Sequence, residues 1–264
     1  MTNADIQMKF EILLKGTNKA SFDLIERAGE LVLKKTYFRI GSAEKDFNLL
    51  LALKKYFRPR TVNNFVYRPL DVFAFDSTRN WLEMELFPGE SIGSHYDKYN
   101  DVSIFYHMGM WLGLLHSQSV NETGHVVCFN DYNRTNCLID FDKNIVTALD
   151  PGHYHQMYVD PGISFVMGLF SVTRGAARVN PLSYFPGGTR FVAGYVEQGV
   201  GLTFLNHLRG ARYLLQRLAS GSSRTVTSKF IGGKLIGFIE VSSLFVFSIL
   251  ACKFMALRLR KIPA

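Results

Sequence analysis

Asp131, Asn136 and Asp150 are the residues of this chain whose types and spacing are best suited to chemistry. The first two begin and end the segment Asp131-Tyr-Asn-Arg-Thr-Asn136, and the third stands in Leu149-Asp150-Pro-Gly152. Carboxylate and amide oxygens of this kind are ligands that Mg²⁺ accepts in proteins. Such ligands, with an acid close by to orient a hydroxyl, are what a phosphoryl-transfer site requires.

The chain between these residues predicts how they come together. Residues 137–141 and 145–149 are apolar and strand-like, and the three residues between them favour a turn. A turn centred on Lys143 would place Asn136 opposite Asp150, with the two side chains about 5 Å apart. An amide oxygen and a carboxylate could then share one hard cation. The acid at the start of the first segment would lie beside that cation.

These residues also have a simpler interpretation, because Asp and Asn are common in turns and Asp-Pro-Gly is an ordinary turn sequence. Their order favours the functional interpretation: an Asp, an Asn five residues later, and a second Asp after a hairpin. Kinases use this order for the residue that orients the acceptor hydroxyl and for the two residues that hold Mg²⁺.

The composition indicates a globular protein with an anionic partner. A chain of 264 residues can form one large or two-lobed domain with a core. The net charge of +8 and the pI near 9.4 favour a nucleotide, a membrane surface or nucleic acid without choosing among them. Nucleic acid ranks last, since the Lys and Arg residues are scattered. Three cysteines without metal-ligand spacing, and a polar N-terminus without a signal peptide, lead us to expect a cytoplasmic protein.

The first third of the chain has the pattern of strands interrupted by one helix. Leu49, Leu50, Leu53 and Phe57 recur at helical spacing, and Ser42 is the expected N-cap of that helix. The expected helix covers residues 42–56, and the expected strands cover residues 10–14, 22–27, 30–37, 72–75 and 81–87.

Asp46 falls on the apolar face of this helix, where a charge is costly unless it is paired. It therefore requires a buried cation. Lys34, on the preceding strand, shares the face of Val32 and points either to solvent or into a cleft. We expect Lys34 to bind the phosphates of a nucleotide and Asp46 to hold it there. Lys35 and Glu44 are the neighbouring alternatives.

Two further segments could bind the nucleotide. A turn that contains Gly16, Thr17 and Asn18 could cover phosphates with backbone N–H groups and hydroxyls, although most such turns only connect strands. Glu85 and Phe87 could offer backbone N–H and C=O groups to the edge of an adenine. The alternative for this second segment is a buried strand that leads into a linker.

Pro88-Gly89 marks the expected boundary between a strand-rich and a helix-rich part. We predict a nucleotide-binding lobe over residues 1–88 and a catalytic lobe over residues 89–264. The fold class is α+β, with an N-terminal antiparallel sheet, one helix and a mostly helical C-terminal lobe. Helical spacing beyond the boundary predicts helices over residues 101–117, 163–173, 191–218 and 235–260.

In the order of these parts the chain resembles the aminoglycoside phosphotransferase-like branch of the protein-kinase-like fold, which includes lipopolysaccharide core sugar kinases and choline-type kinases. The resemblance covers residues 13–217. It rests on Gly16-Thr-Asn-Lys, Leu31-Val-Leu-Lys34, Glu85-Leu-Phe-Pro-Gly-Glu-Ser, Leu115-His-Ser117, Asp131-Tyr-Asn-Arg-Thr-Asn136 and Leu149-Asp150-Pro-Gly152.

The resemblance implies a role for each candidate residue. Asp131 would be the catalytic base, Asn136 and Asp150 the Mg²⁺ ligands, Lys34 the phosphate-binding lysine and Asp46 its acidic partner. It also implies ATP and Mg²⁺ as cofactors and a hydroxyl of a small molecule as the acceptor. A protein acceptor is disfavoured, because the chain lacks the Ala-Pro-Glu triplet that ends the activation segment of protein kinases.

Two departures from the family leave a pseudokinase or a nucleotide-binding scaffold as the alternative. The family carries His two residues before the catalytic Asp, where this chain has Phe129. The acid that pairs with the lysine is usually Glu, and Asp46 is one methylene shorter.

The C-terminal segment over residues 241–252 bears on the acceptor, because it is uncharged and strongly apolar. Lys253, Arg258, Arg260 and Lys261 follow it. It is shorter than the roughly 20 apolar residues of a membrane span. Two interpretations stay open: a buried last helix of the large lobe, or an interfacial helix at the inner face of a membrane. The second would suit a sugar of a glycolipid or lipopolysaccharide-type acceptor.

Overall fold

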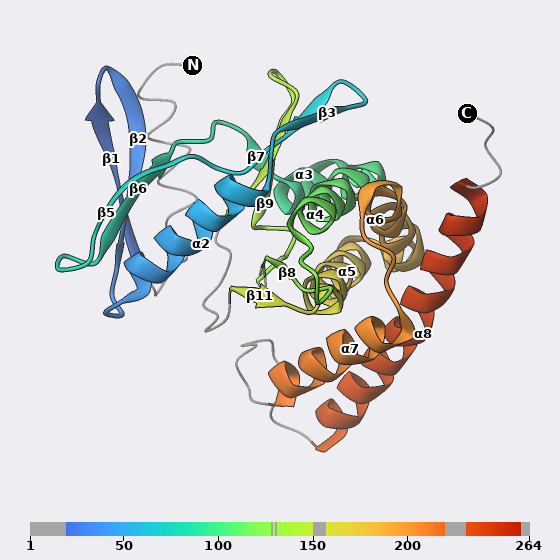
Figure 1. The fold of residues 1–264 in the computed structure, drawn as a ribbon. Helices are drawn as coiled ribbons and strands as arrows, with labels where there is room; N and C mark the ends of the chain where they lie inside the picture. Colours follow the sequence, from blue (N-terminus) through green and yellow to red (C-terminus); the bar gives the residue numbers. More distant parts are fainter. Residues whose placement is uncertain (1–19, 128, 130, 150–156, 220–230, 260–264) are drawn as a thin grey trace.

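The computed structural model describes residues 20–127, 129, 131–149, 157–219 and 231–259. An antiparallel sheet with one helix is followed by a mostly helical part, as the predicted fold class requires (Figure 1). The expected strand over residues 10–14 lies outside the described residues.

The N-terminal sheet has the strand order β1-β2-β6-β5 with antiparallel neighbours. Ala28 and Gly29 join the first two strands with φ of 50° and 83°, the left-handed conformations that a two-residue hairpin favours. The strands are β1 (Ala20–Arg27), β2 (Glu30–Tyr37), β5 (Val72–Asp76) and β6 (Trp81–Glu85).

Helix α2 (Ser42–Tyr56) has the predicted bounds and packs on β5 and β6, and its buried residues include Leu49, Leu50 and Leu53. Its start differs from the prediction. Gly41, with φ of 75°, is the N-cap, and no side chain caps from that position. The amide oxygen of Asn80 accepts the N–H of Ala43 at 3.2 Å instead. This cap comes from the turn between β5 and β6, 37 residues away, so local sequence does not reveal it.

A second sheet has the strand order β3-β4-β10-β9-β7. In this sheet β4, which precedes residue 88, pairs in parallel with β10, which follows it. Strand β7 pairs antiparallel with β9. Hydrogen bonds thus cross the expected lobe boundary, which stays a prediction. The strands are β3 (Arg60–Val62), β4 (Phe65–Tyr67), β7 (Glu90–Ser91), β9 (Cys137–Asp140) and β10 (Ile145–Ala148), and a separate pair joins β8 (Val126–Val127) to β11 (Tyr158–Val159).

The C-terminal part is built around α4 and α6, whose backbones touch. A Cβ at Gly109 would lie 1.9 Å from the carbonyl oxygen of Phe191, and one at Gly194 would lie 2.1 Å from that of Tyr106. Only glycine permits this approach. The helices are α3 (Ile92–Tyr99), α4 (Phe105–Ser119), α5 (Pro161–Val179), α6 (Tyr184–Gln198), α7 (Phe204–Ala219) and α8 (Ile231–Leu259), with short 3₁₀ turns at Val102–Ile104 and Pro181–Ser183.

The single helix expected over residues 191–218 is two helices, α6 and α7. Gly199 ends the first in an extended conformation. Thr203 and Asn206 then cap the start of the second: the Thr203 N–H donates to the Asn206 amide oxygen at 2.8 Å, and the Asn206 N–H donates to the Thr203 hydroxyl at 3.3 Å. Helix α8 lies along the outside of α6 and α7 (Figure 1).

Candidate active site

The β9–β10 hairpin carries Asn136 at its open end, but in a register one residue away from the predicted one. Cys137 pairs with Ala148, and the Leu149 N–H donates to the Asn136 carbonyl at 2.7 Å. Leu149, and not Asp150, therefore lies opposite Asn136. Asp150 itself is outside the described residues, so its assignment as a metal ligand stays a prediction.

The register differs because the hairpin turn has four residues between the paired strand ends. Asp140, whose side chain is buried, accepts the N–H groups of Asp142 and Lys143 at 3.0 and 3.2 Å. Asn144 closes the turn with φ of 53°. An acid that bonds the backbone two and three residues ahead lengthens the turn by one residue relative to a turn centred on Lys143.

The loop before β9 brings Asp131 and Asn136 side by side. The amide nitrogens of Asn133 and Asn136 both donate to the Asp131 carbonyl, at 2.9 and 3.0 Å. The Asn133 amide oxygen accepts the N–H groups of Thr135 and Asn136, at 2.9 and 3.1 Å. Because the Asn136 nitrogen is used inside the loop, its oxygen is the amide atom that a cation would contact.

Two residues inside this segment shape the loop, although they were not among the predicted site residues. Asn133 forms the bonds just described, and its Asn-x-Thr pattern is a recognisable signal for such a turn. Arg134 fixes the loop to α3 through a two-pronged pair with Asp97 at 2.6 and 3.1 Å. Its backbone N–H donates to the Ser171 hydroxyl on α5 at 3.0 Å. The loop is thus held from two helices.

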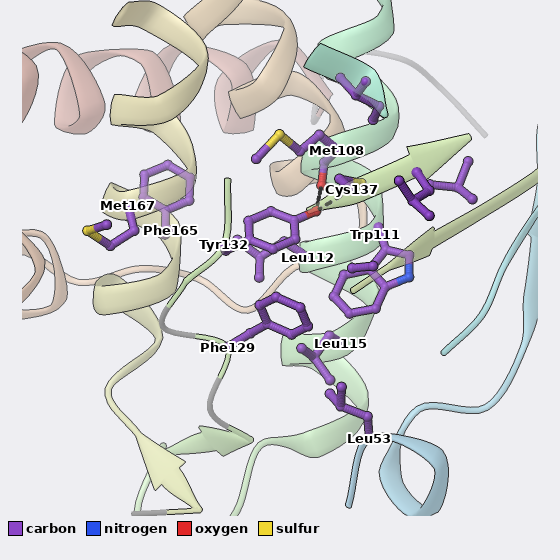
Figure 2. Packing of buried hydrophobic residues seen from close by; sticks show 14 of the residues in the cluster. Leu53, Met108, Trp111, Leu112, Leu115, Phe129, Tyr132, Cys137, Phe165 and Met167 are labelled. Atoms are coloured by element: carbon purple, nitrogen blue, oxygen red, sulfur yellow. Dashed lines mark hydrogen bonds between the residues drawn. The ribbon is translucent and has the colours of Figure 1, made fainter. Parts of the chain in front are cut away.

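Phe129 and Tyr132, which come before and after Asp131 in the chain, both pack on Trp111 in the core (Figure 2). Both side chains are fully buried. Phe129 packs edge-on against Trp111 and Tyr132, with ring centroids 5.4 and 5.3 Å apart. The Tyr132 hydroxyl donates to the Met108 carbonyl at 2.6 Å. At the position where the resembling family has His, this chain supports the loop by apolar packing.

Arg217, in the last turn of α7, reaches the candidate base from 86 residues away. Its Nη2 lies 2.9 Å from Asp131 Oδ1, and both side chains are partly exposed. This ion pair fixes the orientation of the carboxylate. Arg217 was not a predicted site residue, and no local pattern marks it, because only the packing of α7 brings it to the loop.

Lys35, and not Lys34, pairs with Asp46. Lys35 Nζ lies 3.4 Å from Asp46 Oδ2, and both residues are buried. The Tyr37 hydroxyl also donates to Asp46 Oδ2, and the Lys35 ammonium lies 4.5 Å from the Tyr37 ring centroid. The expectation that Asp46 faces inward and holds a buried lysine is therefore confirmed, with the neighbouring lysine as its partner.

The predicted pairing of Lys34 with Asp46 is wrong because it rests on the wrong face of β2, and the phosphate-binding role of Lys34 stays a prediction. The buried residues Leu33, Lys35 and Tyr37 alternate along the strand and share its inner face. Lys34 belongs to the other face, where its ammonium lies 4.7 Å from the Trp81 ring centroid. Both residues are partly exposed there, and a cation over an indole ring is a common arrangement.

The segment expected to meet an adenine is partly used by the sheet. The Glu85 N–H donates to the Asp71 carbonyl at 2.9 Å, so this N–H is engaged within the structure, contrary to the expectation for Glu85. The Glu85 carboxylate forms a two-pronged pair with Arg68 at 2.7 and 2.5 Å, which raises the pKa of Arg68. Phe87 is buried in the core, and its adenine contact stays a prediction.

The linker after Phe87 runs against the hairpin. A Cβ at Gly89 would lie 2.2 Å from the Ile139 carbonyl oxygen, so only glycine fits there. Arg68 extends the contact toward the loop, since its carbonyl accepts the Trp111 indole N–H at 2.9 Å. Trp111 in turn packs on Phe129. Arg68 and Trp111 thus link the expected nucleotide edge to the loop that carries Asp131.

Four of the predicted ligands lie outside the described residues: Gly16, Thr17, Asn18 and Asp150. Within the part of the chain that the structure describes, no three His, Cys, Asp or Glu side chains form a metal-binding group. The pairing of Asn136 with Asp150 as Mg²⁺ ligands stays a prediction.

Comparison with known proteins supports the fold. No protein-family model and no curated protein sequence matches the chain. A choline/ethanolamine kinase family protein from Mesorhizobium loti has a TM-score of 0.51 at 10% identity, over 94% of this chain and 99% of that chain. The PknI kinase domain of Mycobacterium tuberculosis has a TM-score of 0.44 at 12% identity, over 68% of this chain and 84% of that chain. The first likeness shows that the chain has a protein-kinase-like fold, as expected.

Proposed function

We propose that this chain is an ATP-dependent phosphotransferase that moves the γ-phosphoryl group to a hydroxyl of a small molecule. The observation that carries the proposal is the loop in which Asp131 and Asn136 lie side by side, bonded through the Asp131 carbonyl. The buried Lys35–Asp46 pair and the protein-kinase-like fold support it. Together they give one acid for the acceptor, one amide for a cation and one lysine for phosphates.

We assign the cofactors of this reaction to Lys35 and Asn136, together with Asp150, which lies outside the described residues. Lys35, fixed by Asp46, would bind phosphate oxygens, and the Asn136 amide oxygen would hold Mg²⁺ together with Asp150. Bound ATP and Mg²⁺ would supply the phosphoryl group and neutralise its charge. The apolar layer of Trp111 and Phe129 fixes the loop, so that these groups keep their positions.

Asp131 acts on the acceptor in this proposal. Its carboxylate accepts a hydrogen bond from the acceptor hydroxyl and orients the oxygen for in-line attack. In a loose transition state the proton moves late, to the same carboxylate, so orientation contributes more than basicity. Arg217 holds Asp131 Oδ1, which directs the second carboxylate oxygen to the acceptor.

For the acceptor we propose a sugar hydroxyl of a glycolipid or lipopolysaccharide-type molecule, as in the aminoglycoside phosphotransferase-like branch that the sequence resembles. Exposed apolar side chains on α8 support an acceptor that lies in a membrane. A transfer screen tests this acceptor. The protein is incubated with labelled ATP, Mg²⁺ and one acceptor at a time: soluble sugars, aminoglycosides, choline, ethanolamine, or glycolipids in mixed micelles. We expect label on the glycolipid. Label on choline alone or on an aminoglycoside alone would rule out the glycolipid acceptor but would still support the proposed phosphotransferase activity.

A pseudokinase or nucleotide-binding scaffold is the second candidate. The Arg217–Asp131 ion pair favours it, because an arginine that occupies the carboxylate competes with an acceptor hydroxyl. A scaffold would bind nucleotide without metal-dependent transfer. In the same screen it would leave every acceptor unlabelled, while equilibrium binding of a fluorescent ATP analogue would still be seen.

A further inference from the structure

The outer face of α8 is apolar and uncovered. Val246, Leu250, Phe254 and Leu257 recur every three or four residues and are 53%, 61%, 63% and 58% exposed. The window Glu240–Leu257 has a mean hydropathy of 1.7, yet only 17% of it is buried. A surface helix of a soluble domain normally turns polar residues outward. The interpretation of this helix as a buried last helix is therefore wrong for its outer face.

Exposed apolar side chains continue on both sides of this face. Phe185 on α6 meets Phe247, and Phe204 on α7 meets Phe245, each with ring centroids 5.5 Å apart. Phe185 and Phe204 are themselves exposed, as are Leu182 beside α6 and Leu205 on α7. The apolar surface thus spans three elements and is larger than one helix face.

Two hollows flank α8 along this surface. One, of about 310 Å³, lies between α8 and the segment from α6 to α7, and Lys253 is on its lining. The other, of about 620 Å³, lies between α8 and α6 and includes Arg190. Each hollow is lined mainly by apolar side chains and by one Lys or Arg side chain. This combination fits an acyl chain below an anionic headgroup.

Charge identifies what covers this surface. Residues 161–264 contain 13 Lys and Arg residues and two Glu residues, whereas residues 1–160 contain 17 Lys and Arg and 20 Asp and Glu residues. The positive net charge of the chain therefore lies entirely in the part that includes α8. Arg212 on α7 and Lys253 on α8 are exposed there. Two copies of such a surface would repel each other, and an anionic one would attract it.

We propose that the outer face of α8, with its flanking aromatic residues, docks on the surface of an anionic lipid bilayer. The helix is long and apolar enough to cross a membrane by length and composition. Its inner face nevertheless belongs to the domain: Val241, Leu244 and Ser248 are buried, and the Ser248 hydroxyl lies 3.0 Å from His207 Nδ1 on α7. In this proposal the helix lies in the membrane–water interface and stays packed on the domain.

The test is co-sedimentation of the full chain with vesicles of phosphatidylcholine alone or of phosphatidylcholine with phosphatidylglycerol. The double variant Leu250→Glu/Phe254→Glu removes apolar contact, and Arg212→Glu/Lys253→Glu removes charge. We expect the wild type to bind the anionic vesicles and to be released by salt. Each double variant should need at least about tenfold more lipid for half-maximal binding. No nucleotide is present, so the outcome is independent of the proposed activity.

Phe38→Glu/Ile40→Glu is the matched control, because these apolar residues are also exposed but lie in the turn after β2, far from α8 along the chain. It should bind as the wild type does, and circular dichroism should show all variants folded. Three results would overturn the proposal: a wild type that ignores both vesicles, a control that loses binding equally, or a lipid-free dimer that the α8 variant dissociates.

Discussion

Arg217 Nη2 lies 2.9 Å from Asp131 Oδ1, so the end of α7 touches the acid that the loop before β9 presents. The ion pair holds the Asp131 carboxylate in one orientation. The loop alone would leave this side chain free to rotate. The same helix contacts α8, so α7 connects the proposed docking surface to the candidate base. The ion pair is therefore the first relationship to test.

Replacing Arg217 should lower activity by misorienting Asp131. We expect Arg217→Ala to reduce kcat by about tenfold to a hundredfold, since misplacement by about 1 Å has effects of that order. Arg217→Lys should recover part of the loss, because it restores the charge without the planar fork. Steady-state kinetics with saturating ATP measures this, and Gln216→Ala at an exposed position of the same helix is the control. An Arg217→Ala variant that is faster than the wild type would show that the pair inhibits.

Lys35 and Lys34 should differ sharply although they are adjacent. Lys35→Met removes the ammonium group from the buried Asp46 and should weaken ATP binding by at least tenfold, on the order of the loss of one charge-assisted contact. It should also cost about 3 to 5 kcal/mol of unfolding free energy, as breaking a buried ion pair does. Lys34→Met should leave ATP binding unchanged. Nucleotide titration measures the ATP affinity, and urea unfolding measures the stability. Weaker ATP binding in Lys34→Met alone would make Lys34 the phosphate-binding lysine.

Phe129 should be a stability residue that supports the loop. Phe129→Ala leaves a cavity beside Trp111 and Tyr132 and should lower the unfolding free energy by about 3 to 5 kcal/mol. The exposed Phe38→Ala should change it by about 0.5 kcal/mol or less. Urea denaturation compares the two variants. A small effect at Phe129 would mean that the loop does not rest on this packing.

Acid should destabilise the fold through buried histidines. Burial lowers the pKa of His116 to about 3 and the pKa of His107 and of His207 to about 4. Between those values and about pH 6.5 the unfolded chain binds more protons than the folded one, so stability rises with pH and levels off above that range. For the fully buried His116 the slope is about 1.4 kcal/mol per pH unit.

His116→Gln should remove that share of the slope. Unfolding free energies measured from pH 4 to pH 8 should converge between variant and wild type as the pH falls, and above about pH 7.5 their difference should be constant. A pH dependence identical to that of the wild type would contradict a buried, neutral His116. Loss of the hydrogen bond between the Tyr195 hydroxyl and His116 Nδ1, which are 2.9 Å apart, adds a pH-independent loss of stability to the variant.

Regular, amphipathic elements could be predicted from the sequence, and short or paired ones could not. Helix α2 begins and ends where its apolar spacing indicates, because burial of one face decides a 15-residue helix. Strands β7, β8 and β11 have two residues each and no periodicity to detect. Asp46 was located because a charge on an apolar face is costly. Its partner was missed by one residue, since alternation alone does not say which face of β2 is inner.

The site shows the same division. The Asp131–Asn136 segment was found because its chemistry depends on local spacing. The hairpin register was off by one residue because the Asp140 side chain lengthens the turn. Arg217 comes from a helix 86 residues away and meets Asp131 only through tertiary packing. Contacts of that range leave no signal in a local sequence pattern.

The decisive measurement for the proposed phosphotransferase is the transfer of labelled γ-phosphate by the wild type and by Asp131→Asn. Both are assayed with Mg²⁺ and the glycolipid acceptor, beside the control Asp142→Asn in the exposed hairpin turn. We expect Mg²⁺-dependent transfer by the wild type and the control. Asp131→Asn should lose about a hundredfold or more in transfer, with ATP affinity within about twofold of the wild type. Full transfer by Asp131→Asn would rule out its role as the base, and no transfer by the wild type to any acceptor in the panel would rule out the phosphotransferase.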